Sequence, residues 1–284
     1  MAILAQLTGL LYIAAVFLLL LAGKIAYKLT RPSFNLKAEL VEKDNLALAI
    51  ALGGYFLGLT LAVGGALAGT APSLAKGLLA TLFYGLVGII LLNISIRLND
   101  CLILTKCSLD KEIIEDQNCG AGLVAAANYA AVGLILYGVI SGEGGGLAAL
   151  LVFWALGQGA LILAAKVYDL ITPFSLNEVI EKGNTAVGAA LAGVLLAVGN
   201  IVRFAAQGSF VSWSQSLASF AVVAGIGLLL LPLVRLATDK LILPGARLTR
   251  ELVGQEVPNT GAGVLEGAIY VSISFIIGWC FSGG

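Results

Sequence analysis

Eight separate stretches of the chain stay apolar for about 20 residues, the length that an α-helix needs to cross the hydrocarbon core of a bilayer. Hydrophobic residues make up 60% of the 284 residues and charged residues 11%, whereas a soluble domain carries roughly 25% charged residues. The sequence therefore predicts an all-α polytopic membrane protein with eight transmembrane helices. The predicted spans are Ala2–Ala26, Asn45–Gly69, Leu74–Ile96, Cys119–Ile140, Gly146–Leu170, Asn184–Phe204, Trp213–Leu236 and Asn259–Cys280.

The charged residues are concentrated in alternate connections between these spans. Of the 16 Lys and Arg residues, all but Lys76 and Arg203 lie in the first, third, fifth and seventh connections. The positive-inside rule therefore places these four links in the cytoplasm and both termini on the opposite side. The acidic residues follow the same distribution, with Glu143 outside the links and Glu266 within a span. Because the net charge is zero, no long-range attraction of nucleic acid is expected.

The chain contains an internal twofold repeat. Residues 42–45 (Glu-Lys-Asp-Asn) recur as residues 181–184 (Glu-Lys-Gly-Asn), and residues 118–122 (Asn-Cys-Gly-Ala-Gly) recur as residues 259–263 (Asn-Thr-Gly-Ala-Gly). A fixed repeat period indicates duplicated structural units. The sequence predicts two parallel four-helix membrane repeats, 1–142 and 143–284.

Each half also resembles a duplication of a two-helix unit. The common pattern is a Glu, two apolar residues, a second Glu, two variable residues and an Asn, and the fourth copy departs from it by a two-residue insertion and by Gly254 in place of the second Glu. Because each unit has two spans, every copy keeps the same orientation, and such units can surround a path along the membrane normal. The pattern begins at Glu39, Glu112, Glu178 and Glu251 and ends at Asn45, Asn118, Asn184 and Asn259.

The Asn-x-Ala/Gly helix start that follows an acidic amphipathic link, repeated within a four-span unit, resembles the YjfL-like family of bacterial inner-membrane proteins, a domain of unknown function. The usual member of that family is one four-span unit, and this chain resembles two of them in tandem. The resemblance implies a multi-pass protein of the bacterial inner membrane. It brings no catalytic signature and leaves the function open.

The four helix-start asparagines have two interpretations. Asparagine is a strong N-cap because its side-chain oxygen accepts a hydrogen bond from an otherwise unpaired backbone N–H. Four helix N-termini at the cytoplasmic face can also bind an anion. The neighbouring glutamates would repel such a ligand, so the sequence favours the N-cap interpretation.

The cytoplasmic acidic positions Glu39, Glu112, Glu178 and Glu251 are also open to two interpretations. They can form a cation-attracting ring at a vestibule. Alternatively, they form the water-facing side of amphipathic interfacial helices whose apolar residues lie among the lipid headgroups. The second interpretation is favoured because an interfacial helix needs a polar face.

Polar residues within the spans are candidates for transport or proton coupling, because burying them in lipid is costly. Glu266 lies seven residues after Asn259, and its counterpart in the first half is Ala125, so the acid has no symmetric partner. An ion pair with a basic residue is the structural alternative. The candidate amides are Asn93, Asn128 and Asn200, which can line a path or join helices by hydrogen bonds.

The sequence predicts no enzyme. It contains no histidine, which excludes a histidine general base or metal ligand, and the spacing of Cys101, Cys107, Cys119 and Cys280 matches no zinc pattern. No metal or cofactor is expected.

Two functions remain open, and the sequence slightly favours the first. One is a channel or transporter for a small solute or cation. The other is a non-catalytic membrane scaffold or subunit that docks a soluble cytoplasmic partner through the links. The 36 glycines predict close helix packing, and small-residue faces also allow homo-oligomers within the bilayer.

Overall fold

The computed structural model describes residues 2–69, 72–104, 109–242 and 245–282, so Cys107 lies outside the described residues. Within them the protein is helical throughout and contains eight helices long and apolar enough to cross a membrane, which confirms the predicted fold class. The long helices are α1 (Ala2–Thr30), α2 (Leu46–Ala68), α3 (Leu74–Leu102), α5 (Cys119–Ser141), α6 (Gly146–Ile171), α8 (Thr185–Ala206), α9 (Trp213–Ala237) and α11 (Thr260–Ser282).

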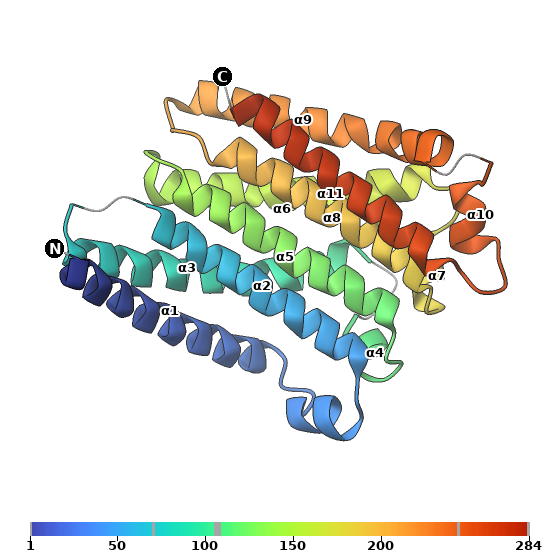
Figure 1. Cartoon of the computed structure of the whole chain (residues 1–284), viewed down its shortest axis with the longest axis horizontal. Coiled ribbons are helices and arrows are strands. Elements are labelled where there is room, and N and C mark those ends of the chain that lie inside the picture. The colour runs from blue at the N-terminus through green and yellow to red at the C-terminus, as the bar shows by residue number, and fades with distance from the viewer. Residues whose placement is uncertain (1, 70–71, 105–108, 243–244, 283–284) are drawn as a thin grey trace.

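Short helices occupy the links that the sequence places in the cytoplasm. They are η1 (Ala38–Glu42), α4 (Leu109–Ile114), α7 (Leu176–Glu181), η2 (Thr238–Ile242) and α10 (Leu248–Val253). Each of them except η2 directly precedes a long helix. Each unit therefore has two long helices joined by a short link helix; we call the first long helix peripheral and the second central. Figure 1 shows α4, α7 and α10 at the same end of the molecule.

The central helices α2, α5, α8 and α11 lie side by side in one row, and α2 and α11 are at its opposite ends (Figure 1). Helices α3, α6 and α9 pack behind the row, each against two neighbouring central helices, while α1 packs against α2 and α3. The sequence allowed the units to surround a common axis. The structure instead displaces each unit sideways from the one before it, so the row encloses no central path.

Glycines allow the central helices to approach until their backbones touch. A Cβ atom added to Gly122 would lie 2.7 Å from the carbonyl oxygen of Ala47, and one added to Gly188 would lie 2.6 Å from the Cα of Gly120. A Cβ atom on Gly263 would lie 2.9 Å from the Cα of Ala186. In all three interfaces, the fourth residue after the helix-start Asn of one unit contacts the second residue after the helix-start Asn of the preceding unit. The same contact is therefore built three times.

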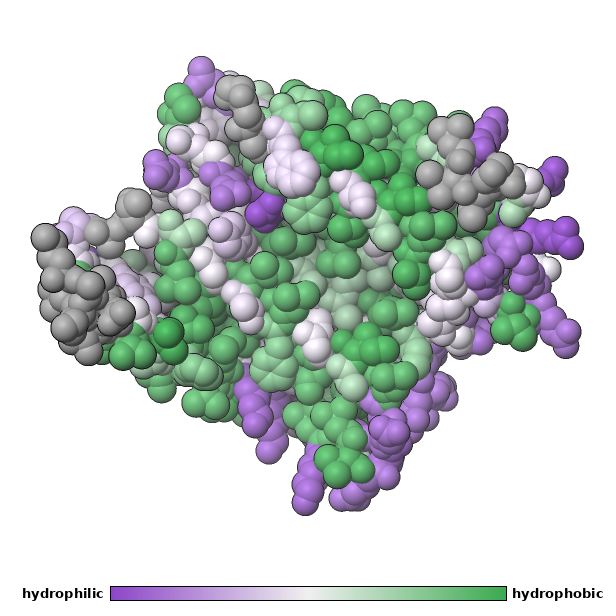
Figure 2. Space-filling model, viewed as in Figure 1, coloured by the Kyte–Doolittle hydropathy of each residue, from purple (hydrophilic) through white to green (hydrophobic). Residues whose placement is uncertain are grey.

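Hydrophobic surface covers the middle of the molecule. Figure 2 shows a broad hydrophobic area, with hydrophilic residues gathered along the edges where Figure 1 places the link helices. Large hydrophobic side chains such as Leu18, Leu21 and Ile25 of α1 are exposed. This distribution is expected of a protein whose middle is embedded in lipid and whose links are in water.

We expect Gly188→Leu to destabilise the protein, because the added side chain would overlap the backbone of α5. Overpacking of this kind costs about 1–3 kcal/mol or more. Thermal unfolding in detergent micelles measures the change. Gly159→Leu on α6 is the matched control, since no atom lies within 4 Å of a Cβ at that position. Equal melting temperatures for the two variants would contradict the tight interface.

Candidate functional site

Each helix-start asparagine caps its helix. The side-chain Oδ1 accepts a hydrogen bond from the backbone N–H three residues later, over 2.9 Å at Asn45 and Asn184 and over 3.1 Å at Asn118 and Asn259. The cap satisfies one of the backbone donors that a helix N-terminus leaves unpaired. The asparagines therefore have a structural role at the start of every central helix.

The same asparagines also join one unit to the next. The side-chain Nδ2 of Asn45 donates to the carbonyl oxygen of Ile113 over 2.8 Å, and that of Asn118 donates to Ile180 over 2.6 Å. Asn184 donates to the carbonyl oxygen of Leu252 over 2.8 Å. Each acceptor lies in the link helix of the following unit. The asparagines thus tie the link helices into a chain that runs parallel to the row of central helices.

Two of the four acidic positions are buried, and at three of them the carboxylate contacts the side-chain amide of the helix-start asparagine in the same unit. Glu39 lies within 3.5 Å of the amide of Asn45, and the Glu112 carboxylate accepts a hydrogen bond from Asn118 over 2.9 Å. The Glu251 carboxylate accepts one from Asn259 over 3.0 Å. These three positions form neither a cation-attracting ring nor a simple water-facing row, because their carboxylates contact asparagine side chains of the protein.

Glu178 differs from these three because it is exposed. The helix that carries it, α7, buries Leu176 and Ile180 and packs against α5 and α8. The apolar face of this link helix was expected among lipid headgroups. It packs instead against protein, because the carbonyl of Ile180 must reach Asn118 in the neighbouring unit.

Glu266 is fully buried and forms an ion pair. One carboxylate oxygen lies 2.8 Å from Nη1 of Arg235 on α9, and the other accepts a hydrogen bond from the Tyr168 hydroxyl of α6 over 3.1 Å. Arg235 also donates to the Tyr168 hydroxyl and to Thr249. The carboxylate is therefore neutralised within the protein. The alternative of an ion pair describes Glu266 better than a free acid in a transport path.

A second buried ion-pair cluster lies in the first half. Arg31, just after α1, contacts the carboxylates of Asp100 over 2.5 Å and Asp110 over 3.2 Å. It also donates to the Tyr27 hydroxyl and lies 5.4 Å above the centre of the Tyr129 ring. Burial acts to lower the pKa of the Arg31 guanidinium, but the tyrosines and carboxylates together raise that pKa above its ordinary value. Arg31 therefore stays charged, and the cluster binds α1 to α3.

The three candidate amides hydrogen-bond to different partners. Asn93 donates to the Tyr55 hydroxyl over 3.2 Å, and Asn200 donates to Ser274 over 3.0 Å. Asn128 accepts a hydrogen bond from Asn99 over 2.9 Å. Within the described residues none of these bonds leads to Glu266. The structure thus distributes the predicted site residues among separate helix contacts.

One group of buried polar atoms lacks hydrogen-bond partners. Asn99 donates to Asn128 and to Gln158, but the Asn99 oxygen and the Gln158 nitrogen have no partner among the described residues. Unpaired buried polar atoms often mark a position for water or an ion. This group lies between α3, α5 and α6.

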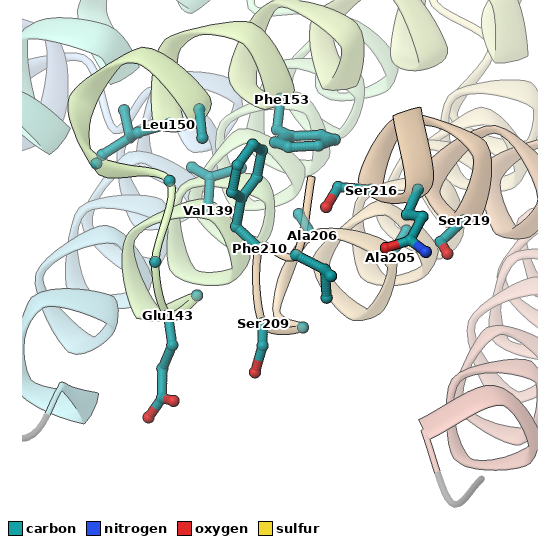
Figure 3. A pocket seen from close by; sticks show the side chains of 18 residues that line it. Val139, Glu143, Leu150, Phe153, Ala205, Ala206, Ser209, Phe210, Ser216 and Ser219 are labelled. Carbon is teal, nitrogen blue, oxygen red and sulfur yellow. The ribbon is translucent and has the colours of Figure 1, made fainter. Parts of the chain in front are cut away.

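A cavity of about 190 Å³ lies at the connection between the two halves. Figure 3 shows Phe153 and Phe210 side by side in its wall, while the Glu143 side chain points away from the cavity. The connection is ordered, because the backbone N–H of Phe210 donates to the carbonyl oxygen of Glu143 over 2.7 Å. Besides glycine backbone and apolar side chains, the lining includes the polar residues Ser209, Gln215, Ser216 and Ser219, and its charged residue is the outward-pointing Glu143.

Sequence reasoning missed the bonds between units and the Arg31 cluster. Ser, Thr, Asp and Asn are all good N-caps, yet all four units use Asn. Of these four, Asn alone has an amide nitrogen that can donate while the oxygen caps the helix. That repeated choice was the available signal. The sequence places Arg31 and Asp100 in cytoplasmic links and gives no sign that the two side chains pair in a buried cluster.

Comparison with known proteins identifies the repeat. A family model described as Domain of Unknown Function (DUF350) matches residues 2–140 and again residues 143–281. No curated protein and no solved structure matches the chain. The two matches agree with the tandem repeat expected from the sequence.

We expect Asn118→Ser to lower the melting temperature more than Asn259→Ser. Serine can still cap the helix, but it is too short to reach the carbonyl oxygen of Ile180, and a buried unpaired carbonyl costs about 1–3 kcal/mol. Asn259 is the matched control. It donates to Glu251 as Asn118 donates to Glu112, but among the described residues it has no bond to a following link helix. Thermal unfolding of monomers in detergent is the measurement. Equal losses would show that the bond between units contributes nothing.

Glu266→Gln should destabilise the protein by about 3–5 kcal/mol, because it leaves the buried Arg235 without a countercharge. The double variant Arg235→Met with Glu266→Leu removes both charges, and replacing a buried ion pair by apolar residues is often neutral. We therefore expect the double variant to melt close to the wild type. The prediction fails if the single variant is as stable as the double one.

Proposed function

We propose that this chain, which belongs to the DUF350 family as two tandem copies of a domain of unknown function, is a non-catalytic membrane scaffold. The proposal places it in the bacterial inner membrane, with the links in the cytoplasm and both termini on the other side. Its role is to present link helices, of which α4, α7 and α10 are fixed in a row, to soluble partner proteins. The observation that carries the proposal is the series of three asparagine bonds that fix α4, α7 and α10 to the unit before each of them.

The links offer charged groups at a regular spacing. The turn before each of the first three central helices is exposed and carries Glu42 and Asp44, Glu115 and Asp116, or Glu181 and Lys182. In the first two links the buried Glu39 and Glu112 contact the helix-start asparagines, so the turn residues rather than these glutamates face the water. A rigid row of such turns is suited to a partner that spans more than one unit.

The membrane part supports a static role. Glu266 and Arg31 are both neutralised by buried partners, and the glycine contacts leave no space between the central helices. Alternating access would require these helices to move relative to one another. Their backbone contacts oppose such a movement.

Transport of a small solute or cation is the second candidate. It is favoured by the unpartnered polar atoms of Asn99 and Gln158, which can hold water or an ion between α3, α5 and α6. The same residues line no continuous path from one side of the membrane to the other within the described structure.

The scaffold proposal predicts crosslinking at the links. A photoreactive amino acid at Glu115 or at Glu181, both exposed, should capture the same soluble protein in cells. The same probe at exposed Glu143, on the opposite side of the membrane, is the matched control and should not capture it. Reversing the turn charges with Glu115→Lys and Asp116→Lys should reduce capture at Glu181 if one partner spans both units. No captured protein at either link would refute the proposal.

Flux measurements separate the two candidates. The scaffold proposal predicts that proteoliposomes with the wild-type chain conduct small cations no faster than empty vesicles. Cation flux in the wild type that is lost when Asn99 and Gln158 are both replaced by leucine, with folding intact, would establish transport instead.

A further inference from the structure

The row of central helices has two open ends whose surfaces match each other. Each central helix has a forward face toward the next unit, formed by the second, ninth and thirteenth residues after its helix-start Asn. Its rear face, toward the preceding unit, is formed by the fourth, eighth and fifteenth residues. Contacts between Gly54 and Ala126 and between Gly193 and Gly267 show the ninth residue of one helix against the eighth of the next. Among the described residues, no unit packs on the forward face of α11 or on the rear face of α2.

Both open faces keep the small residues of the internal interfaces. The forward face of α11 consists of Gly261, Ala268 and Ser272, and all three are exposed. The rear face of α2 consists of Ala49, Gly53 and Thr60, which are exposed as well. A surface that meets only lipid needs no small residues, as the exposed leucines of α1 illustrate. Small residues in the membrane are typical of surfaces that contact another helix.

The hydrogen bonding of the links also stops at the open end. Asn45, Asn118 and Asn184 each donate to a carbonyl oxygen of the following link helix. The amide of Asn259 is exposed and, among the described residues, donates only to Glu251 of its own unit. Asn259 therefore has the geometry to donate to a further link helix. The equivalent acceptor region at the start of the chain lies in η1, where Leu40 occupies the position of Ile113 and Leu252.

An apolar groove at the start of the row lies where a preceding helix would pack. Inside the chain, each of α2, α5 and α8 contacts the peripheral helix, the link helix and the central helix of the following unit. In the first unit the corresponding three elements, α1, η1 and α2, line a groove of about 390 Å³. Its walls include Tyr27, Leu40, Val41, Leu52 and Phe56. No segment of the described chain fills it.

From these observations we propose that α11 of one copy packs into the groove formed by α1, η1 and α2 of a second copy. The forward face of α11 meets the rear face of α2, and Asn259 donates to the first link of the second copy. This contact continues the interface that the chain already builds three times. Because the two surfaces differ, the contact is heterologous, and it produces a ring if it closes or an open row if it does not. The inference concerns self-assembly and does not depend on whether the links dock a soluble partner.

Disulfide crosslinking in membranes tests the orientation of the contact. In a background with the native cysteines replaced by serine, Gly261→Cys and Ala49→Cys are introduced singly or together. The proposal predicts a dimer when the two single variants are mixed and a ladder of higher species for the double variant. Neither single variant alone should crosslink. Efficient self-crosslinking of one single variant would show a symmetric interface and overturn the proposal.

A second variant separates loss of assembly from loss of folding. Gly53→Leu should fold as a monomer, because no atom of the chain lies within 4 Å of a Cβ at this position, yet it should block the rear face of α2. We expect crosslinked species to fall about tenfold or more, while Gly225→Leu on α9, equally open, leaves them unchanged. Single-molecule photobleaching in bilayers provides an independent count of chains. Monomers in the wild type, or an unchanged assembly in Gly53→Leu, would mean that lipid occupies the groove.

Discussion

The structure depends on the close contact between the backbones of neighbouring central helices. A bilayer supplies little hydrophobic force for helix association, so packing and hydrogen bonds must hold the helices together. At each interface the glycine contact lies within about one turn of the asparagine that donates to the next link. Packing and hydrogen bonding therefore fix the same end of every interface. Each unit is stabilised chiefly by its neighbours, as in a repeat protein that extends in one direction.

The buried ion pairs stabilise the ends of this row, where a unit has a neighbour on one side only. Helix α1 is the least buried of the eight long helices, and Arg31 ties its end to Asp100 of α3 and to Asp110. At the other end, Arg235 ties α9 to Glu266 of α11 and to Tyr168 of α6. A charge pair is directional, so it sets the position of a peripheral helix that apolar contacts alone would leave free to slide along lipid.

Hydropathy and periodicity were sufficient to predict the eight helices, the tandem repeat and the caps, because these are local or compositional properties. The arrangement of the units in a row was not predictable, since parallel repeats with the same orientation can be related by rotation or by sideways displacement. The environment of Arg31 was also missed, because hydropathy treats a paired and an unpaired charge alike. Glu266 was recognised as unusual, but its partner Arg235 had been assigned to a link.

The fourth link shows which parts of a unit are constrained. The residue before the helix-start Asn has a positive φ in the first three units, 49° at Asp44, 48° at Gln117 and 79° at Gly183. The fourth unit has Pro258 there, and the proline ring cannot adopt a positive φ, so the turn must follow another course with two additional residues. In the first two units the N–H of the helix-start Asn donates to the carbonyl oxygen of the first Glu of the link, and the longer turn keeps this bond, from Asn259 to Glu251. The chain thus varies where a unit faces water and keeps the positions through which one unit contacts the next.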